Sequence, residues 1–307
     1  MREDYKLCKH IKDNPKLRKS FNQLAFRTFQ LDFEPWYEMG FWKDNYIPFS
    51  LVKGEQVIAN VSVNPMVFDC MGEEKHYIQI GTVMTDPQYR KQGLSRYLLE
   101  TVIQEYKEKT HGIYLFANPS VLDFYPKFGF TKVAQYEYQK KISCSQRVKT
   151  PRKISLDDPV HAKRLTEMIE RGAVNSRLSM RGNPGLVFFY LAQFMKDQVY
   201  WLEEQEAYAV AEEENGVLRL VELFSFHTAD TEAAARAFGP DIKKVILGFT
   251  PLETEGYKTE EISEEEDTLF VLGDDFKIFR EEKSGFSCAV PCIKEFCILP
   301  IIIYAGA

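Results

Sequence analysis

The sequence predicts a mixed α/β fold arranged as two successive domains, over residues 1–145 and 150–307. Three observations lead to this prediction. Both halves contain apolar runs that alternate as strands do, amphipathic segments of helical period lie between these runs, and a polar, turn-rich stretch lies near residues 143–152. A hydrophobic content of 45%, with 14% aromatic residues, is enough to build sizeable cores.

The first half alternates predicted strands and helices around one sheet. The expected elements are an edge strand at 3–11, a helix at 14–29, strands at 49–53, 56–69 and 75–85, a helix that carries residues 98–106, and strands at 113–117 and 131–141. Pro15 is typical of the first turn of a helix, which supports a start of the 14–29 helix there. In the second long strand, Val57, Ala59, Val61 and Val63 share one face, as the two-residue period of a strand requires.

The second half repeats part of this order. The expected elements are helices at 162–171 and 186–196, a hairpin of 208–213 with 217–226, a helix at 231–238 and a strand at 244–250. Asn215-Gly216 is a typical two-residue hairpin turn. The stretch 227–230 lacks a glycine loop and a basic pair, so this half reads as a degenerate copy of the first; chance similarity of two α/β halves is the alternative.

The carboxy-terminal part allows several interpretations. Residues 253–275 hold ten acidic residues against one lysine, which favours a solvated loop. The apolar tail at 296–307 suits a buried strand, a docking segment or an artefact, and tail and acidic stretch together suit an oligomer interface. Cys288, Cys292 and Cys297 lack a nearby histidine and the C-x-x-C spacing, so no metal site is expected.

Charge and composition exclude several partners. The formal net charge is −6, which disfavours nucleic acid, and the basic residues among the first twenty suit a solvated helix face. The amino terminus has no apolar signal core, and no apolar run reaches about 18 residues, so neither secretion nor a membrane span is expected. The six cysteines are then expected to be thiols of a cytoplasmic protein.

Residues 80–99 carry the most informative pattern. An apolar strand meets the turn Asp86-Pro87, then the basic glycine-containing loop of residues 90–95, and then an amphipathic helix. The first N–H groups of a helix have no partners within it and lie at the positive end of its dipole, so such a junction binds anions. The P-loop pattern G-x-x-x-x-G-K-[ST] and the dinucleotide fingerprint G-x-G-x-x-G are both absent.

The loop resembles the signature [QR]-x-x-G-x-[GA] of the GNAT (GCN5-related) N-acetyltransferases, with Arg90, Gly93 and Ser95 at its first, fourth and sixth positions. Ser95 departs from the usual Gly or Ala but is small. The strand, loop, helix and strand order also matches the family, as does the ending F-Y-P-K-F-G-F at 124–130. The resemblance covers residues 3–141, and the two-domain layout is similar to the Eis-type subgroup without its sterol-carrier-like domain.

The resemblance implies a GNAT fold and an enzyme that transfers the acetyl group of acetyl-CoA to the amine of a small molecule, without a metal. It implies a splayed strand whose backbone pairs with the pantetheine arm, the N–H of Met84 as the carbonyl-polarising group, and Tyr125 as the acid that protonates the sulfur. The implied cofactor-binding residues are Val83, Met84, Thr85, Arg90, Lys91, Gln92, Gly93, Leu94, Ser95 and Asn118. A helix-capping role for Asn118 is the alternative.

The acceptor site and the general base are less defined. Residues 32–42 are rich in aromatic and acidic side chains, which suit an amine, and Glu34, Trp36 and Tyr37 are the expected pocket residues. Many family members carry a glutamate on the strand before the loop, where this chain has Gln79, which cannot act as a base. The candidate bases are His76, Asp32, Glu34 and Glu38. Because this glutamate is missing, a non-catalytic acyl-CoA-sensing module is the alternative function.

Overall fold

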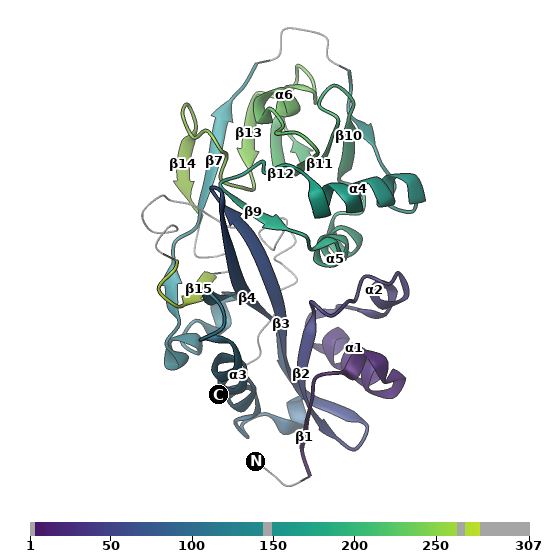
Figure 1. Ribbon diagram of the computed structural model, residues 1–307, viewed down its shortest axis with the longest axis vertical. Coiled ribbons are helices and arrows are strands. Elements are labelled where there is room, and N and C mark those ends of the chain that lie inside the picture. The colour runs from purple at the N-terminus through teal and green to yellow at the C-terminus, as the bar shows by residue number, and fades with distance from the viewer. Residues whose placement is uncertain (1–3, 144–148, 263–267, 277–307) are drawn as a thin grey trace.

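The computed structural model describes residues 4–143, 149–262 and 268–276, which form two mixed β-sheets with helices packed against them (Figure 1). The apolar tail and Cys144, Cys288, Cys292 and Cys297 lie outside these residues. In Figure 1 the sheet in purple and blue lies below the sheet in teal and green, and the strand β3 leads from one toward the other.

The first half of the chain forms most of the lower sheet and its helices. Its elements are β1 (Lys6–Cys8), α1 (Pro15–Phe29), α2 (Glu34–Glu38), β2 (Ile47–Lys53), β3 (Gln56–Cys70), β4 (Glu73–Thr85), α3 (Leu94–Tyr106), β5 (Gly112–Ala117), β6 (Thr131–Val133) and β7 (Tyr136–Lys141). Four short 3-10 helices join them: η1 (Ile11–Asp13), η2 (Pro87–Tyr89), η3 (Pro119–Val121) and η4 (Tyr125–Phe128).

The second half supplies most of the upper sheet. Its elements are β8 (Arg152–Lys153), α4 (Pro159–Arg171), β9 (Leu178–Arg181), α5 (Pro184–Phe194), β10 (Val199–Leu202), β11 (Ala207–Glu214), β12 (Val217–Ser225), α6 (Thr231–Arg236), β13 (Lys244–Leu247), β14 (Lys258–Glu261) and β15 (Thr268–Leu272). The predicted hairpin turn is confirmed, since Asn215 and Gly216 both have positive φ, of 50° and 76°.

The lower sheet has the order β1-β2-β3-β4-β5-β15-β6, and β9 pairs with the far end of β3 beyond β2. Only β4 and β5 run parallel among the pairs of the first half, and α3 connects them. One face of the sheet packs against α3, through Leu98, Leu99 and Val102, and the other against α1 and α2. The predicted α1 begins at an Asn14 cap whose side chain accepts from the N–H groups of residues 16 and 17.

The prediction that residues 131–141 close the lower sheet is wrong for most of that segment. Only β6 pairs there, whereas β7 crosses to the upper sheet and lies between β13 and β14. Alternation in 136–141 correctly indicates a strand. It carries no information about which of two sheets supplies the partners.

The prediction that residues 253–275 form a solvated loop is also wrong. The segment contains β14, and the apolar run Thr268–Leu272 forms β15, which lies between β5 and β6 with Leu269 and Phe270 buried. The acidic residues around this short apolar run masked its strand pattern. The charge of a long window says little about a five-residue buried strand.

The two sheets therefore exchange strands. The lower sheet ends with β5-β15-β6 and the upper sheet with β13-β7-β14, and in each case the middle strand comes from the other half of the chain. We call β7 and β15 the exchanged strands. The upper sheet also repeats the plan of the lower one, because β10, β11 and β12 pair antiparallel, and α6 leads from β12 to the parallel strand β13. The second half thus forms a second α/β unit with a strand plan similar to that of the first, as predicted.

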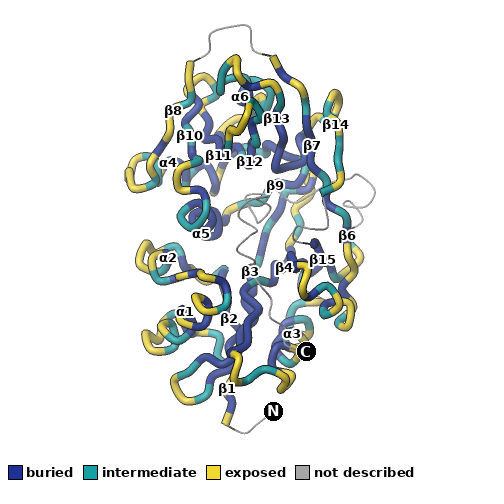
Figure 2. The backbone as a smooth tube through the Cα atoms, turned by 180° about the vertical axis from the view of Figure 1, so that it is seen from behind, coloured by how far each residue is buried: buried dark blue, intermediate teal, exposed yellow. Residues whose placement is uncertain are grey.

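The two halves also meet through the helix α5, which lies beside α2 (Figure 1). Figure 2 shows most of α5 in the colour of buried residues at this junction, and the buried part is Pro184–Leu191. Phe41 stacks on Phe188 with ring centroids 4.3 Å apart, and the indole N–H of Trp36 donates to the carbonyl of Gly185 over 2.8 Å. An apolar helix of this kind is buried on all sides, so α5 belongs to a core shared by both halves.

Candidate active site between the strands β4 and β5

The strands β4 and β5 separate in the middle of the lower sheet. Their parallel pairing runs from Tyr77↔Gly112 to Ile80↔Leu115 and then ends. Beyond that point β4 remains paired with β3, and β5 is paired with the exchanged strand β15. The backbone of Val83–Thr85 is thus paired on one side only, so the predicted splayed strand is present as a structural feature.

A β-bulge accompanies the separation. The register between β3 and β4 shifts between Asn60 and Ser62, and Thr82 on β4 has a φ of 48°. The Asn60 side chain donates to the Thr82 carbonyl over 2.9 Å, and the Thr82 hydroxyl lies 2.9 Å from the hydroxyl of Tyr46. These buried hydrogen bonds fix the bulge directly before Val83.

Burial raises the pKa of Tyr46. Ser62 donates to its hydroxyl oxygen over 2.8 Å. Tyr46 therefore stays a neutral hydroxyl at physiological pH, within a buried chain of hydrogen bonds that supports the bulge.

The loop after β4 leads to the amino terminus of α3. Asp86 is buried, accepts from the N–H of Gln88 over 3.0 Å and pairs with Arg27 of α1 at 2.9 Å. Lys91 and Gly93 then adopt positive φ angles of 62° and 72°. Gly93 is the cap residue of α3, and no side chain caps this end, so its first N–H groups are open to an anion.

A pocket of about 220 Å³ lies at this loop. Four cationic side chains line it, namely Arg90, Lys91, Arg96 and Lys127, and no carboxylate of the described residues belongs to its lining. A Cβ atom at Gly93 would meet no atom within 4 Å, so the backbone there faces open space. Cations around an open helix terminus fit the phosphates of a nucleotide-like cofactor.

The predicted loop residues fall into two groups. Thr85, Arg90, Lys91, Gly93, Leu94 and Ser95 line the pocket, and the hydroxyls of Thr85 and Ser95 lie 2.7 Å apart. Gln92 is exposed and accepts a hydrogen bond from Tyr5 over 3.3 Å. The side chain of Asn118 caps η3 by accepting from the N–H of Ser120 over 2.8 Å, which is the capping alternative for this residue.

Sequence reasoning missed two of the cations. Arg96 lies in the first turn of α3, and Lys127 comes from η4, about thirty residues later in the chain. Neither Lys91 nor Lys127 makes an ion pair within the described part of the chain. Lys127 is part of the F-Y-P-K-F-G-F segment at 124–130, and this position in the family-like segment is the sequence feature that could have indicated it.

Tyr125 lies at the start of η4 and is fully buried. Its ring packs among Phe124, Phe130 and Phe270, and Phe270 belongs to the exchanged strand β15. Its hydroxyl has no hydrogen-bond partner among the described residues, and burial raises its pKa well above the ordinary value. A buried hydroxyl in this state is neutral and has a donor to offer.

A cavity of about 30 Å³ lies on the other face of the separation, between β4, β5 and α5. Asn64, Gln79 and Thr82 line it, and the side chains of Asn64 and Gln79 share a 3.2 Å hydrogen bond. Its wall also contains six aromatic residues: Phe33, Trp36, Tyr46, Phe116, Phe189 and Tyr190. The last two residues belong to the second half, so this cavity depends on both halves.

The structure separates the three predicted acceptor-pocket residues. Trp36 lines the cavity, but Glu34 turns outward and binds Arg18 through both carboxylate oxygens, and Tyr37 lies over the Arg18 guanidinium at 3.7 Å. The cause is the helical period of α2, which points residue 36 inward while residues 34 and 37 face α1.

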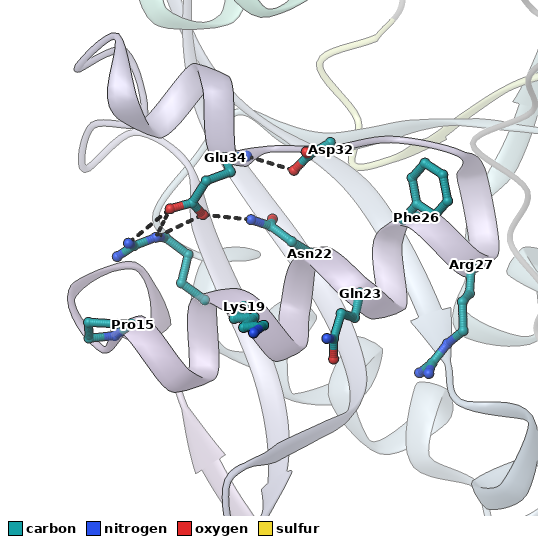
Figure 3. A pocket seen from close by; sticks show the side chains of 9 residues that line it. Pro15, Lys19, Asn22, Gln23, Phe26, Arg27, Asp32 and Glu34 are labelled. Atoms are coloured by element: carbon teal, nitrogen blue, oxygen red, sulfur yellow. Dashed lines mark hydrogen bonds and ion pairs between the residues drawn. The ribbon is translucent and has the colours of Figure 1, made fainter.

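Glu34 belongs instead to an open groove of about 780 Å³ along α1, which Figure 3 shows from close by. Asn22 donates to its carboxylate over 2.8 Å, and the N–H of Glu34 donates to Asp32 over 3.0 Å. Pairing with Arg18 and Asn22 occupies the Glu34 carboxylate, which therefore makes a poor general base.

The other candidate bases also lie outside the cavity lining. Asp32 and Glu38 are exposed, and His76 is exposed and lies 2.9 Å from Glu74. Gln79, the residue that cannot act as a base, is the one that lines the cavity. The lining of this cavity therefore contains aromatic rings but no carboxylate among the described residues.

The upper sheet has a comparable separation, but the chain itself fills it. Pairing of β12 with β13 ends at Leu220↔Leu247. Beyond it, the Asn175 side chain donates to the Leu223 carbonyl over 3.1 Å, and the N–H of Arg177 donates to the Thr250 carbonyl over 2.9 Å. The segment 173–177 thus lies between the two separated strands.

Two further features concern the described residues as a whole. No helix in them is long and apolar enough to cross a membrane. Nor does that part of the chain bring together three or more His, Cys, Asp or Glu side chains in an arrangement that could hold a metal ion.

Comparison with known families matches residues 19–133 to an acetyltransferase (GNAT) domain. This span contains β4, the cationic loop, α3 and η4, so the predicted GNAT resemblance is confirmed for that part of the chain. A comparison with curated protein sequences found no match.

Solved structures with the same fold cover both halves. A conserved protein of unknown function from Enterococcus faecalis V583, described as a probable N-acyltransferase, has a TM-score of 0.54 at 16% identity, covering 90% of this chain and 74% of its own. A GCN5-related N-acetyltransferase from Kribbella flavida has a TM-score of 0.52 at 17% sequence identity, and the match covers 87% of this chain and 70% of that one. Eis1 from Mycobacterium abscessus has a TM-score of 0.52 at 12% sequence identity, and the match covers 87% of this chain and 73% of that one.

Proposed function

We propose that this protein is an N-acyltransferase that moves the acetyl group of acetyl-CoA to the amine of a small molecule. One observation carries the proposal: the separated strands β4 and β5 lead directly into a pocket with four cations at the open amino terminus of α3. The match of residues 19–133 to an acetyltransferase domain and the shared fold of the solved structures support it.

The binding residues would act on different parts of the cofactor. Arg90, Lys91, Arg96 and Lys127, with the first N–H groups of α3, would bind the phosphates. The one-sided backbone of Val83–Thr85 would pair with the pantetheine amides as an added strand.

Acetyl-CoA supplies the activated acyl group. In the transfer, the nitrogen of the neutral amine forms a bond to the carbonyl carbon, and the carbon–sulfur bond breaks. An N–H on the open edge of Val83–Thr85, beside the bulge at Thr82, would donate to the carbonyl oxygen as negative charge develops there; the Met84 N–H itself is turned toward Asn60 of β3 by the register. Tyr125 would give its hydroxyl proton to the departing thiolate, since its raised pKa keeps that proton in place at physiological pH. The proton that the nitrogen loses would pass to water, and Tyr125 would regain a proton from water to complete the cycle.

A structural role is the alternative for Tyr125, because most buried tyrosines are core residues. A structural tyrosine, however, normally satisfies its hydroxyl, and this one has no partner among the described residues. An acid that bonds only to a bound thiol would have this appearance in the free protein.

The two-domain layout supports a relation to the Eis-type subgroup, as proposed from the sequence. We also propose that the catalytic unit is the first half, as far as residue 145. The filled separation in the upper sheet supports this assignment, since residues 173–177 take the place that a pantetheine arm would need.

The test combines binding with turnover. Calorimetry with CoA and acetyl-CoA measures binding, and thiol release with a panel of amines measures transfer. We expect binding and amine-dependent thiol release. Tight binding with no turnover on any amine would support the sensing module instead, and absence of both would refute the proposed function.

A further inference from the structure

The orientation of a bound acyl-CoA follows from the order of features along β4, provided that the proposed function holds. The cationic pocket follows Thr85, so the phosphates lie at that end. A pantetheine arm paired with β4 must then run from Thr85 back toward Val83. With its carbonyl oxygen held at the Val83–Thr85 edge, the rest of the acyl group would extend past Val83 toward Gly81 and Thr82, which line the 30 Å³ cavity.

The size of this cavity limits what can enter. A volume of about 30 Å³ holds roughly two water molecules, and so a group of two or three heavy atoms. All the described residues that line it are uncharged. A short neutral acyl group fits, whereas a longer chain would collide with the wall, and a chain ending in a carboxylate would lose its hydration without gaining a charged partner.

The wall opposite β4 is built by α5. Phe189 stacks on Phe33 with centroids 4.9 Å apart and meets Trp36 edge-on at 5.3 Å, which holds its ring in place. Tyr190 lies beside it and is also buried. These contacts leave the rings little freedom to move aside, because the surrounding core is closely packed.

We propose that Phe189 and Tyr190, which belong to the second half, set the length of the acyl group that the first half transfers, and restrict it to acetyl size. The second half then has a specificity role in the reaction although its own strand separation is filled. The chemical class of donor that fits is a CoA thioester of a short, uncharged acid.

The experiment measures dissociation constants of the full chain for CoA, acetyl-CoA, propionyl-CoA and butyryl-CoA by calorimetry. We expect wild-type protein to bind butyryl-CoA about tenfold or more weakly than acetyl-CoA, since a methylene that does not fit a pocket costs about that factor. The variant Phe189→Ala should bring the two constants within about threefold. Where an amine substrate is known, kcat/KM should follow the same ratio.

Phe188→Ala is the matched control. It removes the same atoms from the same helix, but Phe188 stacks on Phe41 outside the cavity lining. It should keep the wild-type ratio of butyryl-CoA to acetyl-CoA affinity. Equal relaxation in both variants would overturn the proposal, because it would then reflect general loosening of the core.

A second variant tests the cavity from the other side if Phe189→Ala fails to fold. A Cβ atom at Gly81 would meet only the Asn64 amide, at the ordinary contact distance of 3.9 Å, so Gly81→Ala should fold. Its methyl group would reduce the volume of the cavity and weaken the binding of acetyl-CoA about tenfold relative to the binding of free CoA, which has no acyl group. The inference would be overturned if Gly81→Ala left the ratio of the acetyl-CoA and CoA dissociation constants unchanged. It would also be overturned if the wild-type protein bound butyryl-CoA as tightly as acetyl-CoA. Failure of CoA itself to bind would count against the proposed function instead.

Discussion

At the scale of single residues, Tyr125 is the sharpest test of catalysis. Tyr125→Phe should lower kcat about 100-fold or more, as loss of a general acid does, while the dissociation constant of CoA changes little. Stability should not fall, because the removed hydroxyl has no partner in the described structure. Steady-state kinetics, calorimetry and thermal unfolding give the three readouts.

The same tyrosine also allows a prediction of how kcat depends on pH. Because burial raises its pKa well above 10, Tyr125 stays protonated through the neutral and mildly alkaline range. Its ionisation should therefore produce no fall of kcat between pH 7 and about pH 10. A fall in that range that vanishes in Tyr125→Phe would contradict this.

Gly93 tests the loop as an anion site. Gly93→Ala places a methyl group in the open space of the cationic pocket and strains a backbone with φ of 72°, so CoA affinity should fall about tenfold or more. Gly54→Ala is the control, since Gly54 has a similar φ of 61° in the turn between β2 and β3. Both variants should lose about 1 kcal/mol of unfolding free energy, but only the first should lose affinity. Equal affinities would argue against a phosphate site at Gly93.

Residue patterns predicted local features of the site and missed those assembled from distant parts. The positions of Arg90 and Gly93 follow from a continuous loop, so the sequence was sufficient for them. Lys127 and Phe189 reach their cavities through tertiary packing, which no local spacing records. Glu34 and Trp36 line different pockets because two residues that are two apart on a helix point in different directions.

At the scale of elements, the end of β15 is fixed against β4 and β5. Phe276 stacks on Tyr77 with centroids 4.9 Å apart, and Asp275 accepts from the Tyr77 hydroxyl over 2.7 Å. Lys75 also pairs with Asp275 at 3.1 Å. The exchanged strand is thus held by side chains at its end as well as by its backbone.

Gly112 makes room for this contact. A Cβ atom there would lie 2.3 Å from the Phe276 ring, so Gly112→Ala should lower the unfolding free energy by about 1–3 kcal/mol, as overpacking does. The second change Phe276→Leu should recover part of that loss, measured as a coupling in a double-variant cycle by denaturant unfolding. Purely additive effects would mean that Phe276 does not press on Gly112.

Elements were predicted well wherever a strand or helix shows its own period. The helices α1, α3 and α4 and the strands β2 to β5 agree with their predicted spans to within a few residues. The sheet predicted for β7 is wrong, because pairing is decided by strand edges that other parts of the chain create. The strand β15 also lies in acidic surroundings that hid it.

At the scale of the whole molecule, one cofactor site per chain is expected. The lower sheet offers an open separation with a cationic loop, whereas residues 173–177 fill the separation of the upper sheet. Calorimetric titration with CoA should give a stoichiometry near one per chain. A value near two would show that the segment 173–177 moves out of the upper sheet, and Asn175→Ala should then raise the affinity of the second site.

The exchanged strands separate the synthesis of β5 from the synthesis of its neighbour in the sheet. The ribosome completes β5 at residue 117, but its neighbour β15 begins only at residue 268. At a synthesis rate of about 5–20 residues per second, the nascent chain waits roughly 10–30 s with that edge of β5 uncovered. An uncovered strand edge pairs readily with other chains, so the yield of native protein should respond to translation speed and to chaperones that shield nascent strands.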